Sequence, residues 1–128
     1  MSYFERIYVR DSSGTVINPT KIPDSNVIVQ DEDLAVPSGA ETTVLTYSNP
    51  GTTYYLDTVV GSGRYNAEYT VYLGGSLVMK RRTTSAVIDM VQMFPRPLLV
   101  TNGTTVDIKV QHFAGSAREF NATIIGYR

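Results

Sequence analysis

The sequence lacks several residue types, and each absence narrows its chemistry. Its 128 residues include no cysteine, no tryptophan and a single histidine. Without cysteine there is no disulfide scaffold, no thiolate nucleophile and no cysteine-ligated metal site. Basic and acidic side chains nearly cancel, 11 against 12, so the charge gives no support to general nucleic-acid binding. No run approaches the roughly 18 apolar residues of a membrane span, and residues 1–10 lack the apolar stretch of a signal peptide.

What the sequence has in abundance is the β-branched side chain. It contains 15 valines, 8 isoleucines and 15 threonines, together with 9 tyrosines. Stiff χ1 rotamers and flat rings pack well on a pleated surface, so this composition favours an all-β protein. At roughly 100–200 residues per domain, the length predicts one domain, or one domain and an arm.

The chain divides near residue 40. Residues 1–39 show no sustained periodicity and contain three prolines, and five acids but no Lys or Arg occur between residues 24 and 41. We therefore predict an extended N-terminal arm over residues 1–39, with a short hairpin formed by a strand at Phe4–Arg10 and a turn at 11–14. A folded domain is predicted over residues 40–128. A chain that begins at Gly39 should stay folded but lose its association with other proteins.

After residue 40, alternating apolar and polar residues are separated by turn signals at even spacing. Thr104–His112 is the clearest strand, with Val106, Ile108 and Val110 facing inward. Gly74-Gly75 predicts a two-residue hairpin. The segment Ser85–Val100 is ambiguous, and we favour an extended segment or a short helical turn before a strand at Leu98–Val100. The remaining strands are expected at Thr42–Ser48, Thr53–Val60, Asn66–Leu73, Ser76–Arg82 and Glu119–Tyr127.

This pattern predicts an antiparallel β-sandwich. Six to eight short strands with turns every 8–12 residues are typical of a sandwich or a small barrel. The long connection between residues 82 and 104 argues against a simple meander, so a jelly-roll-like or related Greek-key sandwich is favoured. The edges of such open sheets are templates for pairing with another chain.

No catalytic constellation emerges from the sequence. His112 falls on the inward parity of its strand, and no nucleophile or orienting group can be assigned to it, so we interpret it as a partly buried histidine satisfied by a hydrogen bond. Asp57, Glu68, Asp89 and Asp107 are interpreted as solvated surface acids rather than paired catalytic carboxylates. We therefore predict no enzymatic activity, no cofactor and no metal ion.

Two charged runs are candidates for partner binding. Asp31, Glu32 and Asp33 form a dense set of oxygen ligands, but they lack the spacing and the glycine of a Ca²⁺ loop, and a solvated acidic linker is the simpler interpretation. Lys80, Arg81 and Arg82 form the matching basic run. The two runs are either unrelated surface features, or the acidic segment of one copy lies on the basic run of its neighbour and sets register and partner choice.

The tyrosines form a third candidate feature. Adjacent tyrosines and tyrosines of opposite parity place rings on both faces of their strands, so some rings, such as Tyr55 and Tyr72, are expected to be exposed. An exposed tyrosine serves ordinary packing, a protein interface or stacking against a sugar ring. Aromatic rings gathered in one cleft would favour sugar binding, and rings spread along the surface would favour assembly.

Several strand-and-turn segments resemble small structural proteins of tailed bacteriophages. The resemblance covers roughly residues 40–127. It involves residues 41–47, 53–56, 67–75, 105–112 and 120–127.

The resemblance implies a jelly-roll-like virion module and brings no catalytic residues with it. The first expectation is a capsid decoration (cement) protein that binds and stabilises the assembled shell, forms a homotrimer and contacts the major capsid protein. It would be located in the virion, which is assembled in the cytoplasm of the bacterial host, and would bind neither nucleic acid nor membrane. The alternatives are a tail, baseplate or fibre-attachment subunit and, from a different class, a carbohydrate-binding module.

Overall fold

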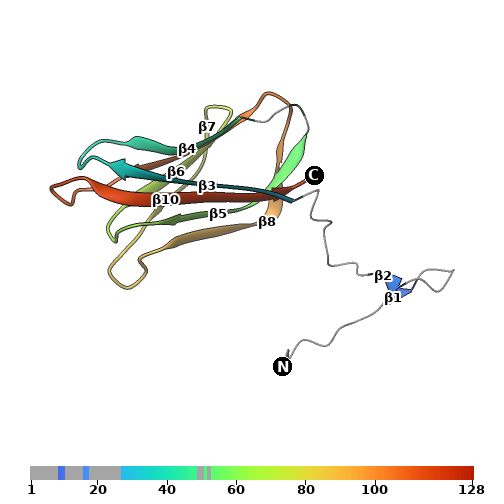
Figure 1. Cartoon of the computed structure of the whole chain (residues 1–128), viewed down its shortest axis with the longest axis horizontal. Helices are drawn as coiled ribbons and strands as arrows, with labels where there is room; N and C mark the ends of the chain where they lie inside the picture. The colour runs from blue at the N-terminus through green and yellow to red at the C-terminus, as the bar shows by residue number, and fades with distance from the viewer. Residues whose placement is uncertain (1–8, 11–15, 18–26, 49–50, 52) are drawn as a thin grey trace.

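The chain forms a β-sandwich of two four-stranded antiparallel sheets, which confirms the predicted fold class (Figure 1). The computed structural model describes residues 9–10, 16–17, 27–48, 51 and 53–128. The first sheet has the strand order β3-β10-β5-β8, and the second has the order β4-β9-β6-β7. In chain order the eight strands are β3 (Val27–Val36), β4 (Thr42–Ser48), β5 (Tyr54–Ser62), β6 (Glu68–Leu73), β7 (Ser76–Arg82), β8 (Met90–Val100), β9 (Thr105–Gln111) and β10 (Arg118–Tyr127).

The connectivity is that of a jelly roll. Successive strands cross from one sheet to the other, except β6 and β7, which form the predicted hairpin. Gly74 and Gly75 both have positive φ, 58° and 82°, as a two-residue type I′ turn requires. Counted from β3, the strand orders 1-8-3-6 and 2-7-4-5 fit the two Greek keys of an eight-stranded jelly roll. No helix that could cross a membrane occurs in the described part of the chain.

The predicted division at residue 40 does not match the structure. β3 pairs antiparallel with β10 along its whole length, from Val27 with Tyr127 to Val36 with Arg118. The sandwich therefore begins at Val27. The sequence pattern hid this strand because β3 is the edge of its sheet, where charged side chains such as Asp31 to Asp33 remain solvated.

Only a small part of the predicted N-terminal hairpin lies among the described residues. β1 (Val9–Arg10) pairs antiparallel with β2 (Val16–Ile17). The predicted turn at 11–14 and the remainder of the predicted strand Phe4–Arg10 lie outside the described residues. The proposal of an arm therefore now concerns residues 1–26.

The ambiguous segment Ser85–Val100 becomes one long edge strand. β8 pairs with β5 from Met90 to Met93 and again from Leu98 to Val100. The residues between these two stretches, which include Pro95 and Pro97, bulge opposite Asp57. Proline is tolerated there because an edge strand has no partner on its outer side for the missing N–H.

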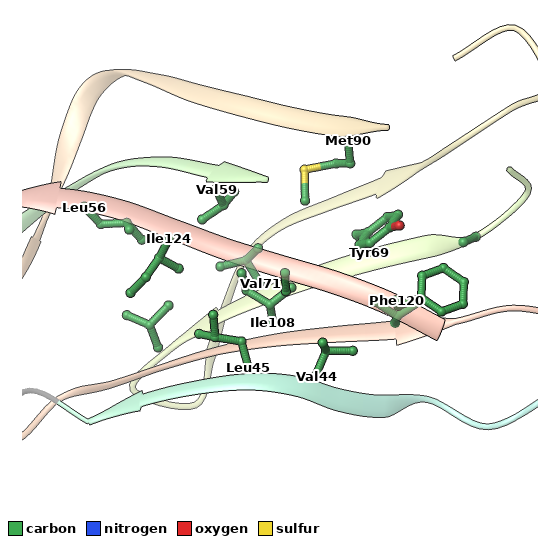
Figure 2. Close-up of a cluster of buried hydrophobic side chains, with 14 of the residues drawn as sticks. Val44, Leu45, Leu56, Val59, Tyr69, Val71, Met90, Ile108, Phe120 and Ile124 are labelled. Carbon is green, nitrogen blue, oxygen red and sulfur yellow. The ribbon is translucent and has the colours of Figure 1, made fainter. Parts of the chain in front are cut away.

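The core lies between the two sheets and draws side chains from both (Figure 2). Val106, Ile108 and Val110 of β9 are fully buried, as the alternation predicts. Tyr69 of β6 packs edge-on against Phe120 of β10, with ring centroids 6.2 Å apart. The core thus supports a rigid frame whose outer faces and edges carry the candidate functional residues.

Candidate interaction surfaces

The acidic residues of β3 are held in place by β10. Asp31 and Asp33 have the same parity and both face the outside of the first sheet, where Asp33 lies opposite Asn121 and Asp31 lies opposite Thr123. The side-chain amide of Asn121 donates to both carboxylates, at 2.5 Å to Asp31 and 2.9 Å to Asp33, and the hydroxyl of Thr123 donates to Asp31 at 2.7 Å. The hydrogen bonds from Thr123 and Asn121 hold the pKa of Asp31 below its ordinary value. These acids are therefore solvated, as predicted, but they lie on an ordered edge strand and not in a linker.

This acidic edge does not have the geometry of a metal site. Glu32 has the opposite parity and lies near Gln30, whose side-chain amide donates to it at 3.4 Å. Among the described residues, no group of three His, Cys, Asp or Glu side chains is placed to hold a metal ion.

The basic run Lys80 to Arg82 lies on β7, the edge of the second sheet. Lys80 forms an exposed ion pair with Glu68 at 3.4 Å. Arg82 donates from Nε to the side-chain oxygen of Asn66 at 3.0 Å. Beside these residues is a surface hollow of about 240 Å³, whose lining includes Arg81, Arg82 and Asp89. Each cation is anchored within its own subunit and still presents positive charge at this edge.

The two charged edges lie on opposite sides of the sandwich. β3 lies beside β4, where the side-chain amide of Gln30 donates to the backbone carbonyl of Thr46 at 3.2 Å. On the other side, Arg81 of β7 donates from Nη1 to Gln92 of β8 at 2.8 Å. One glutamine therefore bridges the two sheets at each open side, and the predicted acidic and basic runs cannot meet within one subunit.

The outer face of the first sheet is apolar over most of its length. The strand registers align its outward side chains in rows that cross all four strands. Met93 is 67% exposed, Val29 is 62% exposed and Val91 is 52% exposed. We call this surface the apolar face. Its first row is Val27, Tyr127, Tyr55 and Leu99, its second row is Val29, Ile125, Thr58 and Met93, and its third row continues from Asp31 through Thr123, Val60 and Val91.

The outer face of the second sheet has a different character. Thr46 donates to Asp107 at 2.7 Å, and Lys109 pairs with Glu41 at 4.0 Å while its ammonium group lies 5.0 Å from the ring centre of Tyr72. Except for Glu41, these residues lie on strands of 6 or 7 residues, which are shorter than the strands of 9 to 11 residues in the first sheet. The apolar face is therefore particular to the first sheet and is not shared by the second.

The predicted aromatic residues do not converge on one cleft. Tyr55 belongs to the apolar face, where its ring stacks on Tyr127 with centroids 5.5 Å apart. Tyr72 lies under Lys109 on the outside of the opposite sheet. The two tyrosines therefore serve separate surfaces.

His112 faces inward and is hydrogen-bonded, as the sequence predicted, but it is fully buried and not partly buried, and both of its ring nitrogens form hydrogen bonds. Nδ1 accepts from the backbone N–H of Ala114 at 3.3 Å, so Nε2 carries the proton and donates to the carbonyl of Val36 at 2.7 Å. The ring also packs against Phe120, with centroids 5.0 Å apart. This histidine ties the end of β3 to the loop after β9, which is a structural role.

Sequence reasoning missed the apolar face. The sequence does contain a sign of this face, because three of the predicted strands include two adjacent apolar residues that point to opposite faces of the sheet. These pairs are Val59-Val60, Leu98-Leu99 and Ile124-Ile125. One member of each pair is needed for the core, so the other must face outward. That the outward members align in rows depends on strand order and register.

Comparisons with models of protein families and with curated proteins find no match. Among solved structures, the chain is similar to a chain in the structure of the infectious bursal disease virus Gt strain, with 13% identity and a TM-score of 0.35 over 88% of this chain. A structure of the Gx strain matches with 12% identity and a TM-score of 0.35 over 97% of this chain. This chain spans 37% and 36% of those two chains. Similarities at this level assign neither function nor partner to this chain.

Proposed function

We propose that this protein is a non-enzymatic structural subunit of a virion, joined to copies of itself and to other virion proteins. The observation that carries the proposal is the placement of an acidic edge, Asp31 to Asp33, and a basic edge, Lys80 to Arg82, on opposite sides of one rigid sandwich. Complementary surfaces on opposite sides of a subunit suit repeated association, because each copy offers one half of the contact to each neighbour.

Contacts of this kind are head-to-tail. A head-to-tail interface generates a closed ring when the rotation between copies closes, and an open filament when it does not. Three copies joined in this way would form the homotrimer that the sequence resemblance implies. Opposite charge at the contact would set register and partner choice, since exposed ion pairs contribute only about 0.2–1 kcal/mol each.

Two features support the assignment of this subunit to a virion: its jelly-roll architecture, and the resemblance of residues 40–127 to small structural proteins of tailed bacteriophages. Double-sheet jelly rolls form the shell domains of many viruses, and they also occur in lectins and cupins. The specific assignment that we propose is a capsid decoration protein of a tailed bacteriophage, with residues 1–26 as an arm along a neighbouring protein. A tail, baseplate or fibre-attachment subunit is the second assignment. The protein would be assembled into the virion in the cytoplasm of the bacterial host.

Charge reversal tests the edge contact. Replacing Lys80, Arg81 and Arg82 by Glu should weaken self-association roughly 3- to 100-fold, the loss of three exposed ion pairs. A chain that also carries Asp31→Lys, Glu32→Lys and Asp33→Lys should associate again, because both edges then have exchanged charge. Lys109→Glu, on the outer face of the second sheet, is the matched control and should leave association unchanged. Sedimentation velocity at low and high salt measures each species, and failure of the exchanged chain to associate would contradict the edge contact.

The virion assignment has its own test. Particles of the virus that encodes this chain, purified on a density gradient and analysed by mass spectrometry, should contain the protein in many copies. A density map of the same particles would place it on the capsid or on the tail. Its absence from purified particles would contradict the virion role, whatever the result of charge reversal.

A further inference from the structure

We infer that β3 of one copy and β7 of its neighbour pair as antiparallel strands, so that the first sheet of one copy continues into the second sheet of the next. The inference rests on the proposed contact between the acidic and basic edges, and it adds the backbone pairing that fixes the register. Each strand is the edge of its sheet, bound to β10 or β6 on one side and to no described strand on the other. Such an edge is a template for a strand from another chain.

The two edges are complementary residue by residue in one antiparallel register. Three consecutive pairs have opposite charge: Asp31 with Arg82, Glu32 with Arg81 and Asp33 with Lys80. The same register places Leu34, which is 39% exposed, opposite the half-buried Met79. A shift of one residue in either direction leaves one acid and one cation without an opposite charge. Because opposite charges directly across two strands stabilise the pair, this register is the favoured one.

The side chains of the two runs face the same way in this register. Asp31 and Asp33 point to the outside of the first sheet, and Glu32 has the opposite parity. On β7, Arg81 lies opposite the buried Tyr69 and so has inward parity, and its two neighbours point outward. In both runs the middle residue faces inward and the flanking residues face outward, so each acid meets its cation on the same face of the joined sheet.

The directions of the strands permit this arrangement. Strands alternate in direction across each sheet, and β3 turns back into β4 through residues 37–41, so β3 and β7 run the same way within one copy. A neighbour turned over about the line that joins the two edges therefore pairs antiparallel. The same rotation places the outer faces of both paired strands on one side.

The backbone groups needed for the pairing lie on the free edges. Thr83, directly after β7, donates its N–H to Ala67 at 2.8 Å, and its carbonyl accepts from the N–H of Asn66 at 2.9 Å. Because backbone groups alternate in direction along a strand, Lys80 and Arg82 direct theirs away from β6.

The same alternation applies to β3. The carbonyl of Glu32 accepts from the side-chain amide of Asn121 on β10 at 3.5 Å, so it is turned toward β10. The backbone groups of Asp31 and Asp33 are therefore directed to the free edge, where the register places them opposite those of Arg82 and Lys80.

Strand pairing also decides the form of the assembly. Repetition of the contact turns alternate copies over and extends the assembly in one direction, so it builds an open row of copies. A closed trimer requires the charged edges to meet without strand pairing. The two arrangements differ in whether the backbone of Lys80 takes part in the contact.

Proline at position 80 tests the backbone pairing. Lys80→Pro removes an N–H that points away from β6, and an edge strand tolerates proline at such a position. Lys80→Ala removes the same charge but keeps the N–H, so it is the matched control. Self-association of Lys80→Pro should be roughly 2- to 10-fold weaker than that of Lys80→Ala, the loss of one hydrogen bond between copies. Sedimentation velocity measures both, and equal association of two folded variants would overturn strand pairing while leaving the edge contact intact.

Cysteine cross-linking tests the register in a chain that has no cysteine of its own. Glu32→Cys and Arg81→Cys form a non-hydrogen-bonded pair, in which Cβ atoms lie closest, at about 4.5–5.5 Å. The two proteins, mixed and oxidised, should form a disulfide efficiently. Glu32→Cys mixed with Lys80→Cys is the matched control, because it also loses one acid and one cation but its two cysteines face opposite sides of the sheet.

The outcomes separate strand pairing from the edge contact. Disulfide formation no faster than in the control, or a closed trimer with no larger species at high concentration, would overturn strand pairing and leave the edge contact standing. A wild-type chain that stays monomeric at the highest soluble concentration would overturn both.

Discussion

The ring of Tyr69 lies directly against the backbone of Gly61, in the space that a side chain at position 61 would occupy. Gly61 lies on β5 of the first sheet and Tyr69 on β6 of the second, so this contact sets how closely the two sheets approach. A Cβ added at Gly61 would overlap the Cε1 and Cδ1 atoms of the ring. Tyr69 is fully buried and also packs against Phe120, so its ring has no room to move away.

Gly61→Ala should therefore destabilise the protein by about 1–3 kcal/mol, the usual cost of overpacking a core. Denaturant unfolding of the wild type, the two single variants and the double variant Gly61→Ala/Tyr69→Val measures the effect. In the Tyr69→Val background, the added alanine should cost much less, because the smaller side chain leaves room for the methyl group. Equal costs of Gly61→Ala in both backgrounds would show that the ring is not the obstacle.

The hydroxyl groups of Tyr54 and Tyr69 are buried and have no hydrogen-bond partner among the described residues. Burial raises the pKa of both, with smaller contributions from Tyr47 to Tyr54 and from Asp89 to Tyr69. Tyr54→Phe and Tyr69→Phe should each leave stability unchanged or raise it by about 1–3 kcal/mol, since a buried unpaired polar group is removed. Thermal unfolding at neutral pH measures this, and a clear loss of stability would reveal a partner.

The same two tyrosines predict a dependence on alkaline pH. Their pKa is raised in the folded state, so the stability they contribute is fully present below the ordinary tyrosine pKa of about 10 and is lost as the pH rises above it. The double variant Tyr54→Phe/Tyr69→Phe should lose less stability than the wild type between about pH 10 and pH 12. Tyr55→Phe, at the exposed face, is the matched control and should follow the wild type.

The hydrogen bonds that hold Asp31 can be tested by titration. Thr123→Val removes the first of them, so the pKa of Asp31 should rise toward its ordinary value of 3.8. Because the folded-state pKa is lowered, the associated stability is present above that value and is lost as the pH falls. NMR titration of the carboxyl groups measures the shift. Thr46→Val, which removes a comparable hydrogen bond to Asp107, should leave Asp31 unaffected.

The two faces of β9 should respond differently to truncation. Ile108 is fully buried, so Ile108→Ala should cost about 2–5 kcal/mol through lost burial and a cavity that does not fully collapse. Lys109→Ala should change stability by less than about 0.5 kcal/mol, because its pairing with Glu41 is long and partly exposed. Denaturant unfolding of the isolated chain compares them, and equal losses would contradict a two-layer sandwich.

The start of the domain can be located by deletion. A chain that begins at Asn26 should unfold as cooperatively as the full chain, because all eight strands are retained. A chain that begins at Gly39 loses β3 and leaves the inner edge of β10 unpaired, so it should unfold or aggregate. Circular dichroism and thermal unfolding compare the two. A stable, cooperative chain from Gly39 would restore the boundary first expected at residue 40.

Residue type and alternation determined the fold class and most of the strands. The period-two pattern of Thr104–His112 predicted which side chains enter the core, because neighbouring side chains on a strand point to opposite faces whatever surrounds them. Gly74-Gly75 predicted its hairpin because only that turn type uses two residues of positive φ between paired strands. His112 was correctly interpreted as facing inward, since its parity follows from the same pattern.

Strand order decided the rest. Alternation cannot show that β3 pairs with β10, residues about 90 apart in the sequence, and an edge strand with charges on both faces does not look like a strand. Only the tertiary structure places the acidic and basic runs on opposite sides of the sandwich. Only the register of four strands aligns Val29, Ile125 and Met93 into one row. The surface of a sheet is formed by residues on adjacent strands, whereas the sequence shows only which residues follow one another along the same strand.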